Sequence, residues 1–172
     1  MYQRINVWLG REIAWWKMPY YVVLAALSIW LCDQLMVFFV LNPLGIHVAG
    51  PRIGDAQYAM EISKYATDRH TFIQHIPAFI KEELYFRAPL FFVAFIPQLV
   101  IPAIFLFSVL FGWLHGDLSN LAIQGVSGII LSVMFLKFGG MQRNIFKGLK
   151  GLLASASTHT LFMFGLWIST KL

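Results

Sequence analysis

The chain has few charged residues and a single cysteine. Only 12% of its 172 residues are charged, whereas about a quarter are charged in a soluble domain. Hydrophobic residues make up 59% of the chain, and the mean hydropathy is +0.69. This shortage of charge argues against a soluble enzyme and predicts an all-α membrane protein. Because Cys32 is the only cysteine, an intrachain disulfide is impossible.

Several familiar sequence signals are also missing. No His-Glu-x-x-His sequence occurs, which removes the best-known zinc hydrolase motif. No internal repeat is visible, which argues against a small transporter built from related halves. The net charge of +5 does not indicate nucleic-acid binding, because the basic residues flank apolar segments as topology signals do. The first apolar run, residues 20–41, is too long for a cleaved signal peptide, so we expect a retained anchor.

The apolar runs predict one membrane domain, residues 1–172, with about five transmembrane helices. We expect the spans at residues 20–41, 78–96, 101–115, 121–138 and 152–168. Residues 1–18 mix tryptophan with basic residues, which is typical of a helix in the lipid headgroup layer. The expected division is an interfacial segment (1–18), an N-terminal span (19–41), a polar loop (42–77) and a four-helix core (78–170). A short surface helix at 55–69 and a basic loop at 139–150 are also expected.

Basic residues in the short loops predict the orientation. Three basic residues precede the first span, and four lie in residues 137–150, whereas residues 116–120 have none. Five spans place the two basic segments on the same side of the membrane, and the positive-inside rule makes that side cytoplasmic. The N-terminus is therefore expected in the cytoplasm. Glu82, Glu83 and His115 are expected near the extracytoplasmic face, with His159 deeper.

An acidic cluster lies in the first turns of the second predicted span. Glu82, Glu83 and Arg87 lie beside long apolar runs, where ionisable residues are by default candidates for a functional site. Glu83 and Arg87 are four residues apart, so they share a helical face and can form an ion pair. Glu82 points about 100° away from Glu83 and is free to act on water or a substrate. The alternative is that both acids only mark a helix start at the water interface.

Two histidines in later spans could join this cluster. His115 ends the third span in Phe111-x-x-x-His115, and His159 lies in the middle of the fifth, where an imidazole is costly unless it is paired. Three spans would then supply Glu82, His115 and His159 to one pocket. This set suits catalytic zinc. It equally suits a carboxylate–histidine pair that activates water while the second histidine stabilises an oxyanion.

Other polar residues have simpler interpretations. Three histidines in or near the polar loop are expected to be ordinary surface residues: His47, His70 and His75. Asp33 lies within the first span, and we expect a structural role, with a proton or ion ligand as the alternative. Asn120 and Gln124 share a helical face and could either donate hydrogen bonds into the site or hold helices together.

Four features follow one another in a fixed order: Glu82-Glu83-x-x-x-Arg87, Phe111-x-x-x-His115, a span with Gly125 and Gly128, and the intramembrane His159. In this order and spacing they resemble the CPBP family, the CAAX proteases and bacteriocin-processing (Abi-like) proteins. The resemblance covers residues 78–168, which would form the four-helix catalytic core.

The resemblance implies a glutamate-type intramembrane protease. Glu82 and His115 would activate the attacking water, and His159 would stabilise the oxyanion. Glu83 and Arg87 would support the site. No metal or other cofactor is expected, with zinc as the alternative. The expected partners are the lipid bilayer and a membrane-anchored protein or peptide, not nucleic acid. A bacterial or archaeal inner (plasma) membrane is the implied location, and C-terminal anchor or sorting segments are the implied substrates.

One position departs from the family pattern. The family's last motif often reads His-x-x-x-Asn, whereas Met163 stands four residues after His159. Methionine cannot donate a hydrogen bond. Ser155, Asn120 or Gln124 could replace the missing donor, or His159 could act alone. Because losing one such donor typically lowers the rate by about 10²–10³, the alternative function is a non-catalytic CPBP-like binding or bacteriocin-immunity membrane protein.

Overall fold

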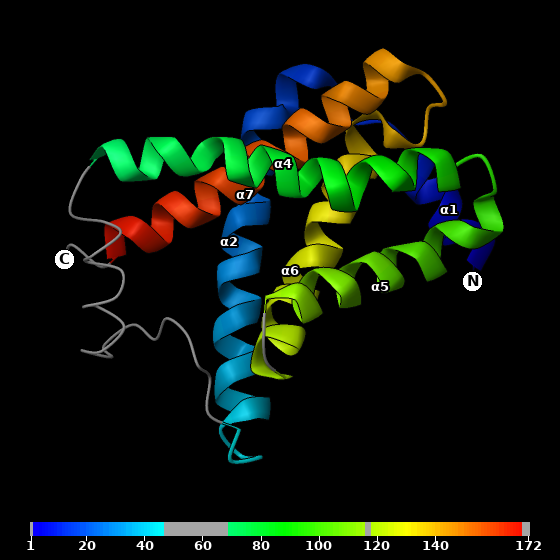
Figure 1. The fold of residues 1–172 in the computed structure, drawn as a ribbon. Coiled ribbons are helices and arrows are strands. Elements are labelled where there is room, and N and C mark those ends of the chain that lie inside the picture. The colour runs from blue at the N-terminus through cyan, green and yellow to red at the C-terminus, as the bar shows by residue number, and fades with distance from the viewer. Residues whose placement is uncertain (1, 47–68, 116–117, 170–172) are drawn as a thin grey trace.

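The computed structural model describes residues 2–46, 69–115 and 118–169. Every regular element in these ranges is helical, which confirms the all-α prediction (Figure 1). The order is α1 (Tyr2–Gly10), the 3₁₀ turn η1 (Trp15–Lys17), α2 (Met18–Met36), the π-helical turn η2 (Val37–Leu41), α4 (Arg69–Val93), α5 (Pro97–Leu114), α6 (Leu118–Phe135), the π-helical turn η3 (Leu136–Gly140) and α7 (Ile145–Ser169).

Four helical segments are long and apolar enough to cross a membrane: Trp15–Leu41, Pro97–Leu114, Leu118–Gly140 and Ile145–Ile168. They correspond to four of the five predicted spans. The remaining predicted span, the second in the chain at 78–96, lies mostly in α4, which is not one of these four segments. Four charged residues crowd the middle of α4: Lys81, Glu82, Glu83 and Arg87. The fold is therefore compatible with an integral membrane protein, and whether α4 crosses the bilayer stays a prediction.

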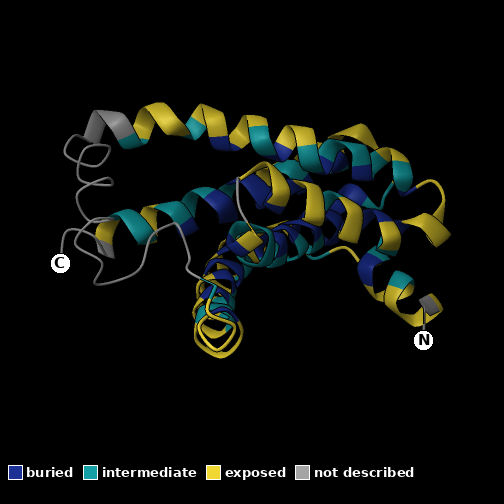
Figure 2. Cartoon of the chain, turned by 60° about the horizontal axis from the view of Figure 1, so that its bottom comes forward, coloured by how far each residue is buried: buried dark blue, intermediate teal, exposed yellow. Residues whose placement is uncertain are grey.

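The outer faces of the helices carry large apolar side chains, as expected for contact with lipid. Phe38, Phe92 and Leu114 are each about 70% exposed, and Figure 2 shows exposed residues along α4 and at the far end of α2. Both views show α2 running at a steep angle to α4 and α7. Buried apolar residues form clusters where α2, α6 and α7 meet, around Ile29, Leu131 and Ala154. A further cluster lies where α4, α5 and α6 meet, around Leu90, Ile104 and Phe135.

Helices α5 and α6 approach each other closely through glycine. A Cβ atom at Gly112 would lie 2.8 Å from the carbonyl oxygen of Leu121. One at Gly128 would lie 3.1 Å from the Cα of Ser108. Small residues let helix backbones come this close in lipid. This contact fixes the end of α5, and therefore His115.

The N-terminal segment packs against the junction of α6 and α7. Lys137 is buried and donates hydrogen bonds to the carbonyl oxygens of Trp8 and Arg11, both at 2.7 Å. Lys147 forms an ion pair with Glu12 at 2.7 Å. We refer to this part of the molecule as the basic end, formed by Arg4, Arg11, Lys17, Lys137, Arg143, Lys147 and Lys150. The two basic segments that were predicted to share one side of the membrane are thus in contact.

Two predicted boundaries are wrong. The polar loop was expected to reach residue 77, but α4 begins at Arg69 and continues through Pro77. Tertiary packing supports this early start, because the Phe72 ring lies 5.5 Å from Phe164 and 5.9 Å from Trp167 in α7. Residues 47–68, which include His47 and nearly all of the expected surface helix at 55–69, lie outside the described ranges, as does the side chain of His70.

The second wrong boundary is the basic loop at 139–150. Helix α7 begins at Ile145, so most of that segment is helical. The Asn144 side chain accepts hydrogen bonds from the backbone N–H groups of Phe146 and Lys147, at 3.0 and 3.2 Å. This is the pattern of a helix N-cap. The connection between η3 and α7 is therefore a short turn.

Candidate active site

Three helices bring Glu82, His115 and His159 together. The Glu82 Oε2 atom lies 3.9 Å from Nε2 of His159 and 4.0 Å from Nε2 of His115. These distances are too long for direct hydrogen bonds. They suit a water molecule held between the three groups. The residues come from the middle of α4, the end of α5 and the middle of α7, which are far apart in the sequence.

Glu83 lies beneath this group at the centre of a buried polar cluster. Its Oε2 atom accepts a hydrogen bond from Nε of Arg87 at 3.2 Å, which confirms the ion pair that the spacing predicted. The same oxygen accepts a hydrogen bond from the Ser155 hydroxyl. Its Oε1 atom lies 3.0 Å from Nδ1 of His159. One carboxylate therefore holds side chains of both α4 and α7.

The two glutamates differ in their access to water. The Glu82 side chain is 35% exposed and that of His115 is 31% exposed, whereas Glu83 and Arg87 are fully buried. His159 lies between these extremes at 7%. The site thus has a water-accessible side formed by Glu82 and His115. Glu83 and Arg87, which are shielded from solvent, form its buried side.

Hydrogen bonds fix the orientation of both imidazoles. His115 Nδ1 lies 2.6 Å from the carbonyl oxygen of Phe111, and because a carbonyl only accepts, this nitrogen carries a proton. His159 Nδ1 faces the Glu83 carboxylate, which is paired with Arg87, and therefore also carries a proton. Both Nε2 atoms face Glu82. In neutral imidazoles these atoms are acceptors.

Three acceptor atoms consequently face one another at the centre of the site. Without a donor between them, Glu82, His115 and His159 would repel each other. A water molecule, which supplies two protons, or an added proton on one of the three groups satisfies this arrangement. The geometry is therefore suited to holding and activating water. Within residues 2–46, 69–115 and 118–169, no cluster of three or more His, Cys, Asp or Glu has the arrangement needed to hold a metal ion.

Aromatic rings enclose the site. The Phe79 ring lies 5.1 Å from the His159 ring, and the Phe111 ring lies 4.6 Å from the His115 ring. The Arg87 guanidinium stacks over Phe111 at 5.1 Å. Its Nη1 and Nη2 atoms are buried and have no hydrogen-bond partner among the described residues. Phe111 therefore contacts both histidines and the supporting arginine.

Two of the three residues that could replace the hydrogen-bond donor missing at Met163 bond to other groups. Met163 is half-buried and packs against the apolar cluster around Ile29 and Phe162. The Asn120 side chain donates a hydrogen bond to the His115 backbone carbonyl at 2.9 Å, so it supports the turn that carries His115. Ser155 is bound to Glu83. Among the described residues, Gln124 takes no part in the hydrogen bonds of the site.

Asp33 lies away from this cluster and is buried between α2 and α6. It accepts a hydrogen bond from the Ser127 hydroxyl at 3.3 Å. This contact between two helices fits the predicted structural role. His75 is exposed on α4, and its ring lies 6.4 Å from that of Phe79.

Sequence reasoning named Ser155 only as a possible oxyanion donor, not as a partner of Glu83, and it did not name Phe79. Ser155 lies one helical turn before His159 on the same face of α7, and this spacing was the signal for it. Phe79 lies one turn before Glu83 on α4, but an apolar residue in an apolar segment gives no such signal.

Comparisons of the chain with protein-family models, with curated proteins and with solved structures found no match.

Proposed function

We propose that the protein is an intramembrane endopeptidase of the glutamate type, similar to CPBP proteases. The observation that supports this most directly is that Glu82 Oε2 lies 4.0 Å from Nε2 of His115 and 3.9 Å from Nε2 of His159. The activity requires a base beside a water molecule and a donor for the oxyanion. Glu82 can serve as the base, and His159 can serve as the donor when its Nε2 atom, 3.9 Å from Glu82 Oε2, carries a proton.

In the first step, a water molecule held by Glu82 and His115 attacks the carbonyl carbon of the scissile peptide bond. The water proton passes to the Glu82 carboxylate, and a C–O bond forms as the carbonyl π bond opens. The proton then moves from Glu82 to the leaving amide nitrogen as the C–N bond breaks. One carboxylate thus acts first as base and then as acid.

His159 would stabilise the oxyanion. As an imidazolium it donates Nδ1–H to Glu83 and presents Nε2–H to the site. Glu83 holds the ring in this orientation, and Arg87 and Ser155 in turn hold Glu83. The support is rigid because Glu83 and Arg87 are fully buried. This role does not depend on a side chain at the position of Met163.

The proposed substrate is a membrane-tethered protein cut near the extracytoplasmic face of a bacterial or archaeal inner membrane. His115 follows the end of α5 opposite to Pro97, and the Pro97 carbonyl oxygen accepts a hydrogen bond from Asn6 beside the basic end. If the basic end faces the cytoplasm, the water-accessible side of the site faces outward. C-terminal anchor or sorting segments of exported proteins fit this placement.

The decisive experiment measures cleavage of a C-terminally anchored substrate by purified protein in liposomes. Glu82→Gln keeps the shape of the side chain but removes the base, and we expect a rate lower by at least about 10²-fold. We expect His115→Ala and His159→Ala to lose similar activity. Glu12→Gln is the matched control, because Glu12 lies at the basic end and should leave the rate unchanged. Equal rates in all five proteins would overturn the proposal.

The same assay tests the proposed absence of a metal. We expect full activity after treatment with a chelator. Activity that disappears with the chelator and returns with zinc would show that Glu82, His115 and His159 act as metal ligands instead.

The second candidate is a non-catalytic CPBP-like binding or bacteriocin-immunity protein. The observation that favours it is the residue at position 163. Met163 packs into the apolar cluster and supplies no side-chain amide that could donate a hydrogen bond to an oxyanion. This candidate predicts that Glu82→Gln keeps full biological activity in cells. The protease proposal predicts its loss.

A further inference from the structure

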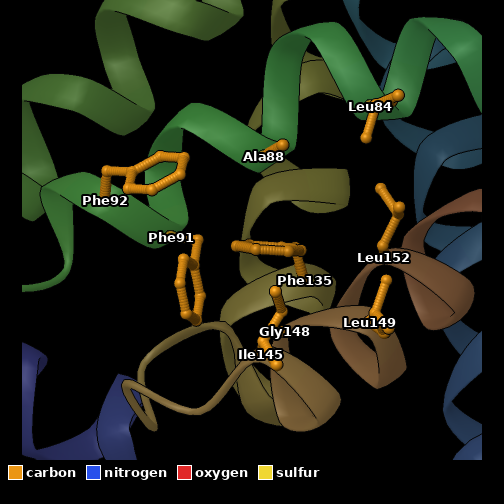
Figure 3. Close-up of a pocket in the computed structure, with 9 residues that line it drawn as sticks. All are labelled: Leu84, Ala88, Phe91, Phe92, Phe135, Ile145, Gly148, Leu149 and Leu152. Atoms are coloured by element: carbon orange, nitrogen blue, oxygen red, sulfur yellow. The ribbon is translucent and has the colours of Figure 1, made fainter.

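An apolar cavity of about 230 Å³ lies between α4 and α7, and Glu83 is not among the residues that line it. Figure 3 shows its lining side chains facing one another across the gap between the two helices, with the Phe135 ring from the end of α6 at the centre. The lining consists of Leu84, Ala88, Phe91, Phe92, Phe135, Ile145, Gly148, Leu149 and Leu152. None of these side chains has a polar atom, so the cavity suits a hydrocarbon group.

Glycine and alanine keep this cavity open. A Cβ atom at Gly148 would lie 3.0 Å from the Phe91 ring, so any side chain there would enter the space beside that ring. Ala88 lies opposite on α4 with the smallest possible side chain. Leu149 lines the cavity and is 56% exposed, so the cavity opens to the lipid-facing surface.

A cation stands at one end of the cavity. The Phe91 ring contacts the Phe95 ring at 5.9 Å, and the Arg143 guanidinium stacks on Phe95 at 5.4 Å. Arg143 also donates a hydrogen bond to the Phe95 carbonyl oxygen at 3.1 Å. An unbroken set of contacts therefore leads from the apolar wall to an exposed guanidinium. With five N–H groups, this guanidinium can serve the carbonyl and a phosphate oxygen together.

The backbone at Arg143 is strained. Its φ of 51° makes it the one non-glycine residue with positive φ among the described residues. Glycine and asparagine adopt this conformation most readily, and an arginine adopts it at a cost. A glycine or an asparagine would fit this turn with less strain. The turn instead contains Arg143, whose side chain reaches Phe95.

We infer that this groove binds an anionic phospholipid of the surrounding bilayer. One acyl chain would occupy the cavity between α4 and α7, and the phosphate would bind the Arg143 guanidinium. The charge around the groove complements such a headgroup, because the basic end carries seven basic residues, with Glu12 paired to one of them, Lys147. A zwitterionic lipid with the same chains would lack the net charge that this end attracts.

Native mass spectrometry of the purified protein tests this inference without reference to proteolysis. The probes are phosphatidylglycerol and phosphatidylcholine with identical acyl chains. We expect the wild-type protein to retain phosphatidylglycerol preferentially. Arg143→Gln should lower its apparent affinity about fivefold, the effect of removing one basic residue near a charged membrane surface. Arg4→Gln is the matched control, because Arg4 is an exposed arginine of the basic end that does not contact the groove.

Two variants test the place of the acyl chain. Ala88→Phe fills the cavity and should lower retention of both lipids. Leu149→Ser puts a hydroxyl on its exposed rim without emptying the core, so it tests the same point if Ala88→Phe fails to fold.

Equal losses in Arg143→Gln and Arg4→Gln would show only diffuse attraction to the basic end and would overturn the inference. Equal retention of the two lipids, or lipid retention unaffected by both cavity variants, would overturn it as well. A change from dimer to monomer in Ala88→Phe would identify a second copy of the chain as the occupant. None of these outcomes depends on the Glu82 chemistry, so the proposed protease activity stands or falls separately.

Discussion

Glu82 and Glu83 are neighbours in the chain, yet they have opposite environments. Glu83 is buried and bound by Arg87, Ser155 and His159, whereas Glu82 is partly exposed and makes no direct hydrogen bond to either histidine. The 100° step between successive helical residues is enough to separate them. One acid can hold the structure while the other meets water, which is how two carboxylates in one site commonly divide their roles.

Part of this division could be predicted from the sequence. The four-residue spacing of Glu83 and Arg87 predicted their ion pair, because this pairing depends only on helix geometry. The meeting of Glu82 with His115 and His159 depends on how three helices pack, so the sequence could suggest a shared pocket for these residues but could not give its geometry. The bond from Ser155 to Glu83 joins residues 72 positions apart and could not be predicted from spacing at all.

The buried ion pair leads to a prediction about stability. Arg87→Met removes one partner and leaves the Glu83 carboxylate buried with fewer donors, so we expect the free energy of unfolding to fall by about 3–5 kcal/mol. Glu82→Gln should change it by less than about 0.5 kcal/mol, because Glu82 is partly exposed. Denaturant titration in detergent micelles measures both. An Arg87→Met protein as stable as the wild type would contradict the supporting role of this pair.

At the scale of elements, the close approach of α5 and α6 can be tested at two glycines. Gly112→Ala would place a Cβ atom 2.8 Å from backbone of α6, which cannot move as a side chain could. We expect a loss of about 1–3 kcal/mol of stability. Activity should fall too, because the His115 N–H bonds to the Gly112 carbonyl oxygen at 3.1 Å.

Gly125→Ala is the control, because its Cβ atom would lie 3.6 Å from the nearest atom across the interface, an ordinary contact. It should be neutral or slightly stabilising, since alanine favours a helix over glycine. Thermal unfolding and the cleavage assay report the two effects. If the two variants behaved alike, the α5–α6 spacing would not be set at Gly112.

Element boundaries were predicted less well than element types. Asn144 is a good N-cap residue, and its position before an apolar helical pattern could have located the start of α7. The basic residues that follow suggested a loop instead. The early start of α4 had no local signal, because it depends on Phe72 reaching Phe164 and Trp167 in the last helix. Pro77 made a boundary there look natural.

At the scale of the whole molecule, charge is distributed unevenly. Basic residues gather where α1 meets the turn between η3 and α7, and His115 lies at the opposite end of α5. The sequence predicted that the two basic segments share a side, and their contact in the fold agrees with it. The number of crossings does not follow from composition alone, because the charged residues that α4 contributes to the candidate site also lower the hydropathy of that helix.

The orientation can be measured with single cysteines in a Cys32→Ser background. We expect Lys17→Cys to react with membrane-impermeant reagents only from the cytoplasmic side, and Leu114→Cys only from the opposite side. Both positions are exposed, so each thiol is accessible. Ser28→Cys, within the first span, is the control that should react from neither side. Labelling of both cysteines from one side would exclude a membrane-crossing α5.

The long sequence separation between Glu83 and its partners in α7 has a consequence for protein synthesis. Glu83 and Arg87 emerge from the ribosome well before Ser155 and His159, which complete the cluster around them. Until then the candidate site lacks one of its two imidazoles. The nascent chain therefore carries the Glu83–Arg87 ion pair before the site is complete. Any hydrolytic activity would arise only after α7 has been synthesised.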